Sequence, residues 1–293
     1  MVENINACLM INNNWSGTFH GAKGLELYYQ SWHPQGLTEA VLIIIHGHGG
    51  HSGIFPLMVE YLIEHNYAVY SFDLRGNGRS PGQRGYINSW SEFREDLGSF
   101  VDLVKAKEPD QDLFIIGQSM GGTIALDYVL RESLQLKGLI LLAPALGLGV
   151  TSWKLLAGKI LSGVLPRFSL ATGIDFSAAS RDPKAVAACK EDPLRHSRGT
   201  ARLATELLNT IEWIEAHIAE IKVPLLILHG GADTVTLPQS SRIFFERLTL
   251  ADKERQEYPG SYHELHSDIN YQEVLEDMED WIQRHLLSSG IIK

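Results

Sequence analysis

The sequence predicts an α/β fold in which a mostly parallel central sheet is flanked by helices and interrupted by a helical cap insertion. Short, almost continuously apolar runs recur along the chain, and amphipathic segments lie between them. From about Gly147 to Glu220 there is no strand candidate, although strands are expected before and after this region. The alternation predicts βαβ units, and its interruption predicts a cap inserted between two strands of the sheet.

The expected strands follow one another along the chain. Gly24–Trp32 is predicted as an early strand, in a hairpin with residues 15–21. The later strands are apolar at nearly every position, which is typical of parallel strands that are covered on both faces. They are expected at Val41–Ile45, Tyr67–Phe72, Leu113–Ile116, Leu139–Ala143 and Leu225–Leu228.

Two helices are predicted from apolar residues at helical spacing. One pattern comprises Trp90, Phe93, Leu97, Phe100, Val101 and Val104, and the other comprises Tyr271, Val274, Leu275, Met278, Trp281 and Ile282. We therefore expect a core in two parts, residues 1–146 and 219–293, with a helical cap at 147–218.

Composition and charge exclude several classes of function. The net charge is −10 over 293 residues, whereas nucleic-acid binding requires a basic surface. Cys8 and Cys189 are the only cysteines, which is too few for a disulfide framework. No signal peptide and no stretch long enough to span a membrane are visible. We expect a cytoplasmic protein without nucleic-acid partners.

The strongest chemical signal is the run LFIIGQSMGG at residues 113–122. It places Ser119 in a G-x-S-x-G motif, where an apolar strand ends and a helix begins. A tight turn at this point exposes the serine hydroxyl, and bulk two positions to either side would collide with neighbouring backbone. Because serine alone is a poor nucleophile, it needs a base and an acid that orients the base.

Candidates for the base and the acid follow later strands. Asp233 lies in a loop after the strand at Leu225–Leu228, and His263 lies in a further loop before the last helix. Catalytic groups of open α/β sheets gather at this carboxyl edge. The chain order Ser119, Asp233, His263 is the order nucleophile, acid, base that strand–turn–helix serine hydrolases show. His266 is the only close rival of His263 for the base.

The run HGHGGHSG at residues 46–53 has two interpretations. Its three histidines have the H-x-H-x-x-H spacing of some di-zinc hydrolases, but that pattern requires an aspartate where Gly50 stands. The alternative is a glycine-rich loop that turns backbone N–H groups toward an oxyanion. We expect no metal, and an oxyanion hole formed by the N–H groups of His48 and Met120. His46 is then a brace for the loop, and His51 with Ser52 a helix start.

These motifs resemble those of α/β-hydrolases of the monoglyceride lipase and lysophospholipase group, also classed with serine aminopeptidase-like hydrolases. The resemblance covers nearly the whole chain. It rests on HGHGGHSG, FDLRGNGRSPGQRGY, GQSMGG, LHGGADTVT and YPGSYHELH, and on the cap segments WKLLAGKILSGVLPRFSL and SRDPKAVAACKEDPL. It implies an α/β-hydrolase fold, a Ser119–His263–Asp233 triad, no cofactor, and single-chain acyl esters as substrates.

The chain departs from this family at the substrate pocket. Animal monoglyceride lipases carry Glu and Arg in the first loop, near the polar end of the pocket, and Gly50 and Ile54 occupy those places here. Thr236 stands where those enzymes have a cysteine near the acid. Asn77 replaces a common histidine in the second motif. His266 matches a second histidine of the polar pocket, so Ile54, Thr236 and His266 are the candidate pocket residues.

The sequence favours an esterase of monoacylglycerols or lysophospholipids that acts through an acyl-enzyme. A broad carboxylesterase and an acyltransferase could use the same triad, and a non-catalytic ligand receptor of the same fold is an alternative of another class.

A helix of the cap could also contact lipid surfaces. Its apolar stripe comprises Trp153, Leu156, Ile160, Leu161 and Val164, with Leu155 and Leu165 beside it. The stripe either packs on the core or docks on micelles and membranes.

Overall fold

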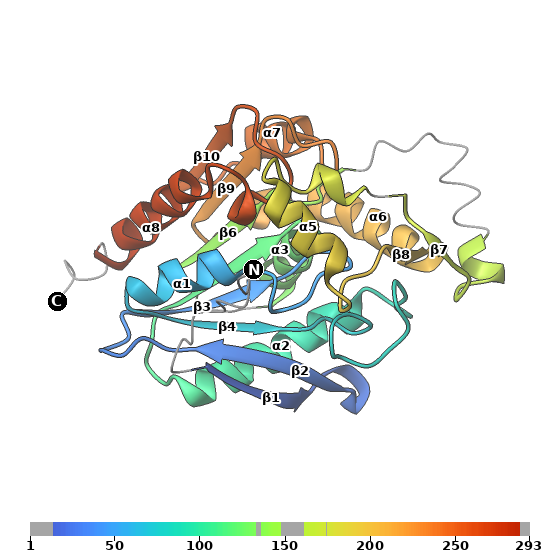
Figure 1. The fold of residues 1–293 in the computed structure, drawn as a ribbon, viewed down its shortest axis with the longest axis horizontal. Helices are drawn as coiled ribbons and strands as arrows, with labels where there is room; N and C mark the ends of the chain where they lie inside the picture. The colour runs from blue at the N-terminus through green and yellow to red at the C-terminus, as the bar shows by residue number, and fades with distance from the viewer. Residues whose placement is uncertain (1–13, 133–135, 148–160, 174, 288–293) are drawn as a thin grey trace, which may run out of the picture.

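An eight-stranded sheet forms the centre of the protein (Figure 1), in the order β1-β2-β4-β3-β5-β6-β9-β10. This computed structural model describes residues 14–132, 136–147, 161–173 and 175–287. The strands of the sheet are β1 (Asn14–His20), β2 (Glu26–Trp32), β3 (Ala40–Ile45), β4 (Tyr67–Phe72), β5 (Leu113–Gln118), β6 (Gly138–Leu142), β9 (Leu225–Gly230) and β10 (Lys253–Tyr258).

Helices cover both faces of the sheet. They are α1 (Pro56–Glu64), α2 (Ser91–Lys107), α3 (Met120–Arg131), α5 (Pro183–Glu191), α6 (Ala201–Ala216), α7 (Pro238–Arg247) and α8 (Tyr271–Leu287). Short 3₁₀ turns lie at Ala22–Gly24, Phe176–Ala178, Ile218–Glu220 and Leu265–Ser267.

Alternate residues of each strand enter different cores. Leu42 and Ile44 of β3 pack with α1 and α8, whereas Ile43 and Ile45 pack with α2 and α3. Because both faces are buried, β3 is apolar at all of its six positions.

The pairing confirms the expected parallel sheet. β1 and β2 form the predicted antiparallel hairpin, and β2 pairs antiparallel with β4. All pairings from β4 across to β10 are parallel. The strands predicted from apolar runs correspond to β3, β4, β5, β6 and β9, and the two predicted helices correspond to α2 and α8.

Three strands lie where none was expected. β10 reads KERQEY and pairs with β9 alone at the sheet edge, so it lacks the apolar pattern of a central strand. The expectation of no strand between Gly147 and Glu220 is wrong, because β7 (Ser169–Ala171) pairs antiparallel with β8 (Arg198–Thr200). Strands of three residues carry no readable periodicity, and only their mutual pairing creates them.

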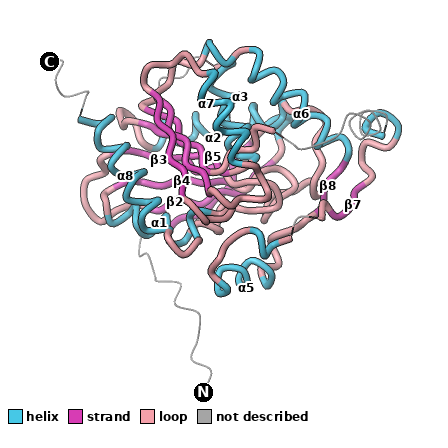
Figure 2. The backbone as a smooth tube through the Cα atoms, turned by 90° about the horizontal axis from the view of Figure 1, so that it is seen from above, coloured by secondary structure: helices cyan, strands magenta, loops and turns pink. Residues whose placement is uncertain are grey.

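The segment inserted between the neighbouring strands β6 and β9 is called the cap below. In it β7 and β8 lie beside each other and next to the start of α6, whereas α5 stands apart from α6 (Figures 1 and 2). Helix α6 also packs on α3, and its Ile214 joins the main core. Trp153, Leu155, Leu156 and Ile160 of the predicted stripe lie outside the described residues. Within the part of the chain that is described, no helix is long and apolar enough to cross a membrane.

A buried carboxylate of α2, that of Asp96, joins this helix to the first hairpin and to the segment after β4. The carboxylate of Asp96 accepts hydrogen bonds from Nε and Nη2 of Arg75, both at 2.6 Å, and from the N–H of Ala22 at 2.8 Å. Asp96 is fully buried, so this carboxylate satisfies donors that water cannot reach.

We expect Asp96→Ala to lower the free energy of unfolding by about 3 kcal/mol or more, because it leaves the Arg75 guanidinium buried with part of its partners removed. Urea denaturation monitored by circular dichroism measures the change. Glu254→Ala is the matched control, because the ion pair of Glu254 with Arg284 is exposed, and such pairs contribute about 0–1 kcal/mol. Equal losses in both variants would contradict the prediction.

Candidate active site

Ser119 occupies a strained turn between β5 and α3. Its φ of 54° and ψ of −120° lie outside the regions that side-chain-bearing residues normally adopt. Hydrogen bonds hold the turn on both sides: the N–H of Ser119 donates to the carbonyl of Leu142 at 2.9 Å, and its carbonyl accepts from Ala145 at 3.0 Å. The strain is therefore compensated by the neighbouring strand β6.

The glycines around Ser119 are required by close backbone contacts. A Cβ at Gly121 would lie 2.2 Å from the carbonyl oxygen of Ile45, and one at Gly117 would lie 2.6 Å from the Cα of Gly122. The turn thus packs directly on the end of β3, where the glycine-rich loop begins. These close contacts explain why the G-x-S-x-G motif has glycine at both positions.

His263 and Asp233 form a buried hydrogen-bonded pair. Nδ1 of His263 donates to Oδ2 of Asp233 at 2.7 Å, and both side chains are at least nine-tenths buried. Asp233 lies in the loop after β9, and His263 lies in a loop before the last helix, α8, as predicted. Because Nδ1 donates to Asp233, Nε2 is the ring nitrogen of His263 that can accept a proton.

Asp233 is held by more donors than the sequence suggested. Its Oδ1 accepts from the N–H groups of Val235 and Thr236 at 2.7 and 3.0 Å, and Nε2 of His229 lies 3.3 Å from Oδ2. Burial opposes the charge, but the hydrogen bonds from His229 and His263 lower the pKa of Asp233 well below its usual range. The carboxylate is therefore ionised at neutral pH.

Gln118 connects His263 with the glycine-rich loop. Its Oε1 accepts from the N–H of Gly47 at 2.9 Å, and its Nε2 lies 3.4 Å from Nε2 of His263. Gln118 is the last residue of β5 and directly precedes Ser119. Its side chain therefore contacts both Gly47 and His263.

The N–H groups of His48 and Met120 have no acceptor among the hydrogen bonds of the described residues. Met120 is the first residue of α3, where a backbone N–H lacks an intrahelical partner. Both residues line the same cavity as Ser119. Two unpaired donors thus lie beside the serine.

The three histidines of the glycine-rich loop do not converge. His46 is the brace that was expected, since its Nε2 accepts from the N–H of Leu74 at 3.0 Å and its Nδ1 donates to the carbonyl of Gly47 at 2.7 Å. His51 instead pairs with Asp192 of the cap at 2.7 Å. The expectation of a helix start at His51 is wrong, because α1 begins at Pro56 and Ser52 Oγ accepts from Gln30.

The cap is hydrogen-bonded to this same loop. The N–H of His196 donates to the carbonyl of Gly49 at 3.1 Å, and Oδ1 of Asn77 lies 3.2 Å from the N–H of Gly49 and 2.9 Å from Nε2 of His196. Asn77 therefore bridges the loop and the cap, a role that its place in the second motif did not suggest.

Two cavities open beside Ser119. The large cavity, of about 790 Å³, lies between the core and the cap, and His48 and Met120 also line it. Most of its wall is apolar, including Leu161, Phe168, Leu170, Leu203, Leu207 and Val235. The small cavity, of about 60 Å³, contains Ser119 and His263 together with the charged side chains of Arg195 and Glu264.

The three predicted pocket residues are placed differently. Ile54 lines the small cavity and Thr236 lines the large one, where its Oγ1 lies 2.9 Å from Oδ2 of Asp233. His266 is buried against the ring of Phe55, and Nε2 lies 3.9 Å from Glu264. It is not among the residues that line either cavity.

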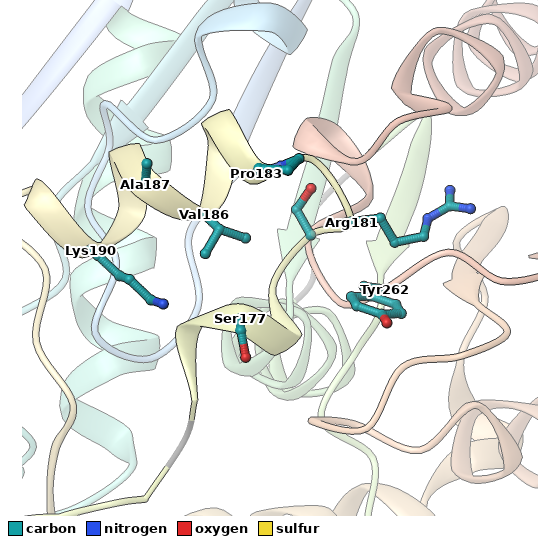
Figure 3. A pocket seen from close by; sticks show the side chains of 8 residues that line it. Ser177, Arg181, Pro183, Val186, Ala187, Lys190 and Tyr262 are labelled. Carbon is teal, nitrogen blue, oxygen red and sulfur yellow. The ribbon is translucent and has the colours of Figure 1, made fainter.

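A third hollow lies outside the predicted site (Figure 3). It is an open groove of about 490 Å³ between α5 and the loop that carries Tyr262, just before His263. Lys190 and Arg181 lie at opposite ends of it in this view, with Val186 and Pro183 between them. Nε of Arg181 is paired with Oδ2 of Asp268 at 3.0 Å.

The sequence profile of the family described as serine aminopeptidase, S33, matches residues 36–270. A monoacylglycerol lipase of Mycolicibacterium smegmatis is 31% identical over 272 residues, which cover 92% of this chain and 97% of the relative. A phospholipase of Bacillus subtilis is 30% identical over 239 residues, covering 80% and 92% of the two chains.

Solved structures agree with these relatives. The crystal structure of a monoacylglycerol lipase of Paleococcus ferrophilus superimposes with a TM-score of 0.81 at 32% identity, covering 89% of this chain and all of that one. The expected α/β-hydrolase fold is thereby confirmed.

Sequence reasoning missed four residues of the site. His229 supports Asp233, Gln118 contacts His263, and Arg195 and Glu264 place a charged pair in the small cavity. His229 and Gln118 had a signal, since each lies within a motif, LHGGADTVT and GQSMGG respectively. Glu264 adjoins His263 in sequence, but its partner Arg195 is 69 residues away.

Buried histidines predict a loss of stability in mild acid. Burial lowers the pKa of His266 to about 4, whereas an unfolded histidine has a pKa of about 6.5. Between these values the unfolded state binds a proton that the folded state does not, so stability falls as the pH falls through this window. When the pH falls from 7 to 5, we expect the free energy of unfolding to drop less in His266→Leu than in the wild type. The difference between the two drops should be on the order of 1–2 kcal/mol.

Urea denaturation at both pH values measures this difference. His20→Leu is the matched control, because His20 is exposed at the end of β1. If His266→Leu keeps the full pH dependence of the wild type, His266 does not contribute to it.

Proposed function

We propose a function for this chain from one premise: it belongs to the serine aminopeptidase S33 family of α/β-hydrolases. The chain is an enzyme, a carboxylic ester hydrolase. The proposal is that it cleaves esters of single-chain lipids, monoacylglycerols or lysophospholipids, through an acyl-enzyme on Ser119. The observation that carries it is the large, mostly apolar cavity that opens at Ser119.

In the first step, Oγ of Ser119 attacks the carbonyl carbon of the ester while Nε2 of His263 accepts the hydroxyl proton. The imidazolium then protonates the alcohol oxygen, the bond between acyl carbon and alcohol breaks, and an acyl-enzyme remains. Water, deprotonated by the same histidine, releases the fatty acid in the second step. Asp233 holds the imidazole in the required tautomer through the 2.7 Å hydrogen bond to Nδ1 and stabilises its charged form.

Each tetrahedral intermediate carries a negative oxygen that needs donors already in place. The unpaired N–H groups of His48 and Met120 suit this role. Because the cap is hydrogen-bonded to Gly49, the residue next to His48, the position of the cap also fixes the first of these donors. No metal or other cofactor takes part in the proposed reaction.

The large cavity supports a substrate with one acyl chain. Its apolar wall comes from both core and cap, so a chain entering there leaves water over most of its length. The phospholipase relative supports lysophospholipids as a second substrate class. A broad carboxylesterase and an acyltransferase would share the mechanism and differ in the alcohol or the acceptor.

We also propose that the enzyme docks on lipid surfaces through the cap. Val164, Leu165, Phe168 and Leu170 are 72%, 53%, 52% and 57% exposed, and they cluster in seven residues of sequence. Phe168 and Leu170 also line the large cavity, so its mouth lies beside this apolar patch. A substrate could pass from a lipid surface into the cavity without crossing bulk water.

We expect Ser119→Ala to lower kcat roughly 10⁵–10⁶-fold with an unchanged fold, because it removes the nucleophile. Activity is measured on monoacylglycerols, lysophospholipids, triacylglycerols and short p-nitrophenyl esters.

His263→Ala should lower kcat comparably, whereas His266→Ala should affect kcat mildly. A fluorophosphonate probe should label Ser119, and failure of the wild type to label would favour a non-catalytic receptor.

The docking proposal is tested by Val164→Ser/Leu165→Ser, because neither side chain is among those that line the cavities. Burying each side chain fully would contribute about 1.5–3 kcal/mol, so the variant should float with liposomes far less than the wild type. Its activity on a soluble short-chain ester should persist. Leu37→Ser/Leu287→Ser is the control, since both leucines are exposed away from the cap. Unchanged flotation, or a lowered melting temperature with equal loss on all substrates, would contradict docking.

A further inference from the structure

The small cavity beside Ser119 differs in chemistry from the large one. Gly50 of the glycine-rich loop and Ile54, which directly follows that loop, form part of its wall, and neither can bind a polar group through its side chain. Arg195 and Glu264 stand in the same wall. A charged pair therefore faces a cavity that also contains Ser119 and His263.

The two charges come from separate parts of the molecule. Glu264 directly follows His263 in the core, and Arg195 lies in the cap between α5 and β8. Both nitrogens at the end of the Arg195 guanidinium donate to the Glu264 carboxylate. Their side chains are only 10% and 11% exposed, so the pair is nearly removed from bulk water.

The pair has unused hydrogen-bonding capacity. A carboxylate can accept about four hydrogen bonds, and the side chain of Glu264 receives two, both from Arg195. Nε of Arg195 and Nε2 of His48, another residue of this wall, are buried without a partner among the described residues. Burying charged groups that lack some of their hydrogen-bond partners is costly unless a ligand supplies those hydrogen bonds.

The position of the pair indicates which ligand this is. Beside Ser119 the large apolar cavity takes the acyl chain, so the small cavity is left for the alcohol part of the ester. An alkyl alcohol would leave the charged pair unsatisfied. A hydroxylated alcohol would complete it, with hydroxyl groups donating to Glu264 and accepting from Arg195.

We infer that Arg195 and Glu264 form a polyol-binding subsite that makes the enzyme select esters of glycerol over esters of simple alcohols. This rests on the proposed function of the same site. In the same cavity wall Gly50 and Ile54 offer no polar side chain, so the charged groups of the pair are the ones a hydroxylated ligand could meet there. Because Arg195 belongs to the cap, the subsite is complete only when cap and core are together.

The test compares two esters of one fatty acid, 1-monododecanoylglycerol and ethyl dodecanoate. Arg195→Met/Glu264→Gln removes both charges together, so no single charge is left buried. We expect kcat/KM for the glycerol ester to fall about tenfold or more relative to the ethyl ester, because the hydroxyl groups lose charged partners. Inhibition by free glycerol should weaken in parallel.

Arg247→Met/Glu215→Gln is the matched control, since this pair is joined at 3.1 Å but is exposed on the surface. It should leave the ratio of the two kcat/KM values unchanged. If the first double variant does not fold, Arg195→Lys keeps the charge without the planar guanidinium and should lower the ratio by a smaller factor.

The outcomes separate this inference from the proposed function. Equal losses on both esters, or an unchanged ratio in a folded variant, would overturn the subsite while the esterase stands. A wild type that prefers the ethyl ester would also overturn it. A wild type inactive on both esters would overturn the proposed function, and the subsite with it.

Discussion

The structure depends on the close approach of three backbone segments at Ser119. The strained turn after β5 presses on the end of β3 through Gly121, and it is tied to β6 by the hydrogen bond from Ser119 to Leu142. The contact at Gly121 leaves no room for a side chain. The carboxyl ends of the parallel strands must therefore meet at this edge, and the loops that carry His48, Asp233 and His263 are brought to one place.

The cap is part of this centre rather than an addition to it. Its loop between α5 and β8 contacts the glycine-rich loop through Asp192 and His196, and contacts the residue after His263 through Arg195. Each contact joins a residue of the core with a residue of the insertion, and two of the core residues, Gly49 and Glu264, directly follow His48 and His263 in the sequence. A movement of the cap would consequently alter a donor of the proposed oxyanion hole, the polar cavity and the mouth of the apolar cavity together.

The two cavities divide the proposed substrate at its ester bond. A large apolar wall on one side and a small charged wall on the other favour molecules with one long chain and a compact polar end. Selectivity in such a site comes mainly from the polar side, because an unpaired buried charge penalises a wrong ligand more than a missing methylene does.

The sequence alone predicted the first hairpin, the central parallel strands, the turn at Ser119, and the loops that carry Asp233 and His263. Short stretches of sequence specify these features. A strand that is buried on both faces is apolar at nearly every position, and the turn at Ser119 requires glycines at fixed spacing. Tertiary structure decided what depends on distant partners. Strands β7 and β8 exist only through each other, and β10 needs β9 beside it. The charges of Arg195 and Glu264 form one group only after folding, because no local pattern encodes which of many surface-type residues will be buried together.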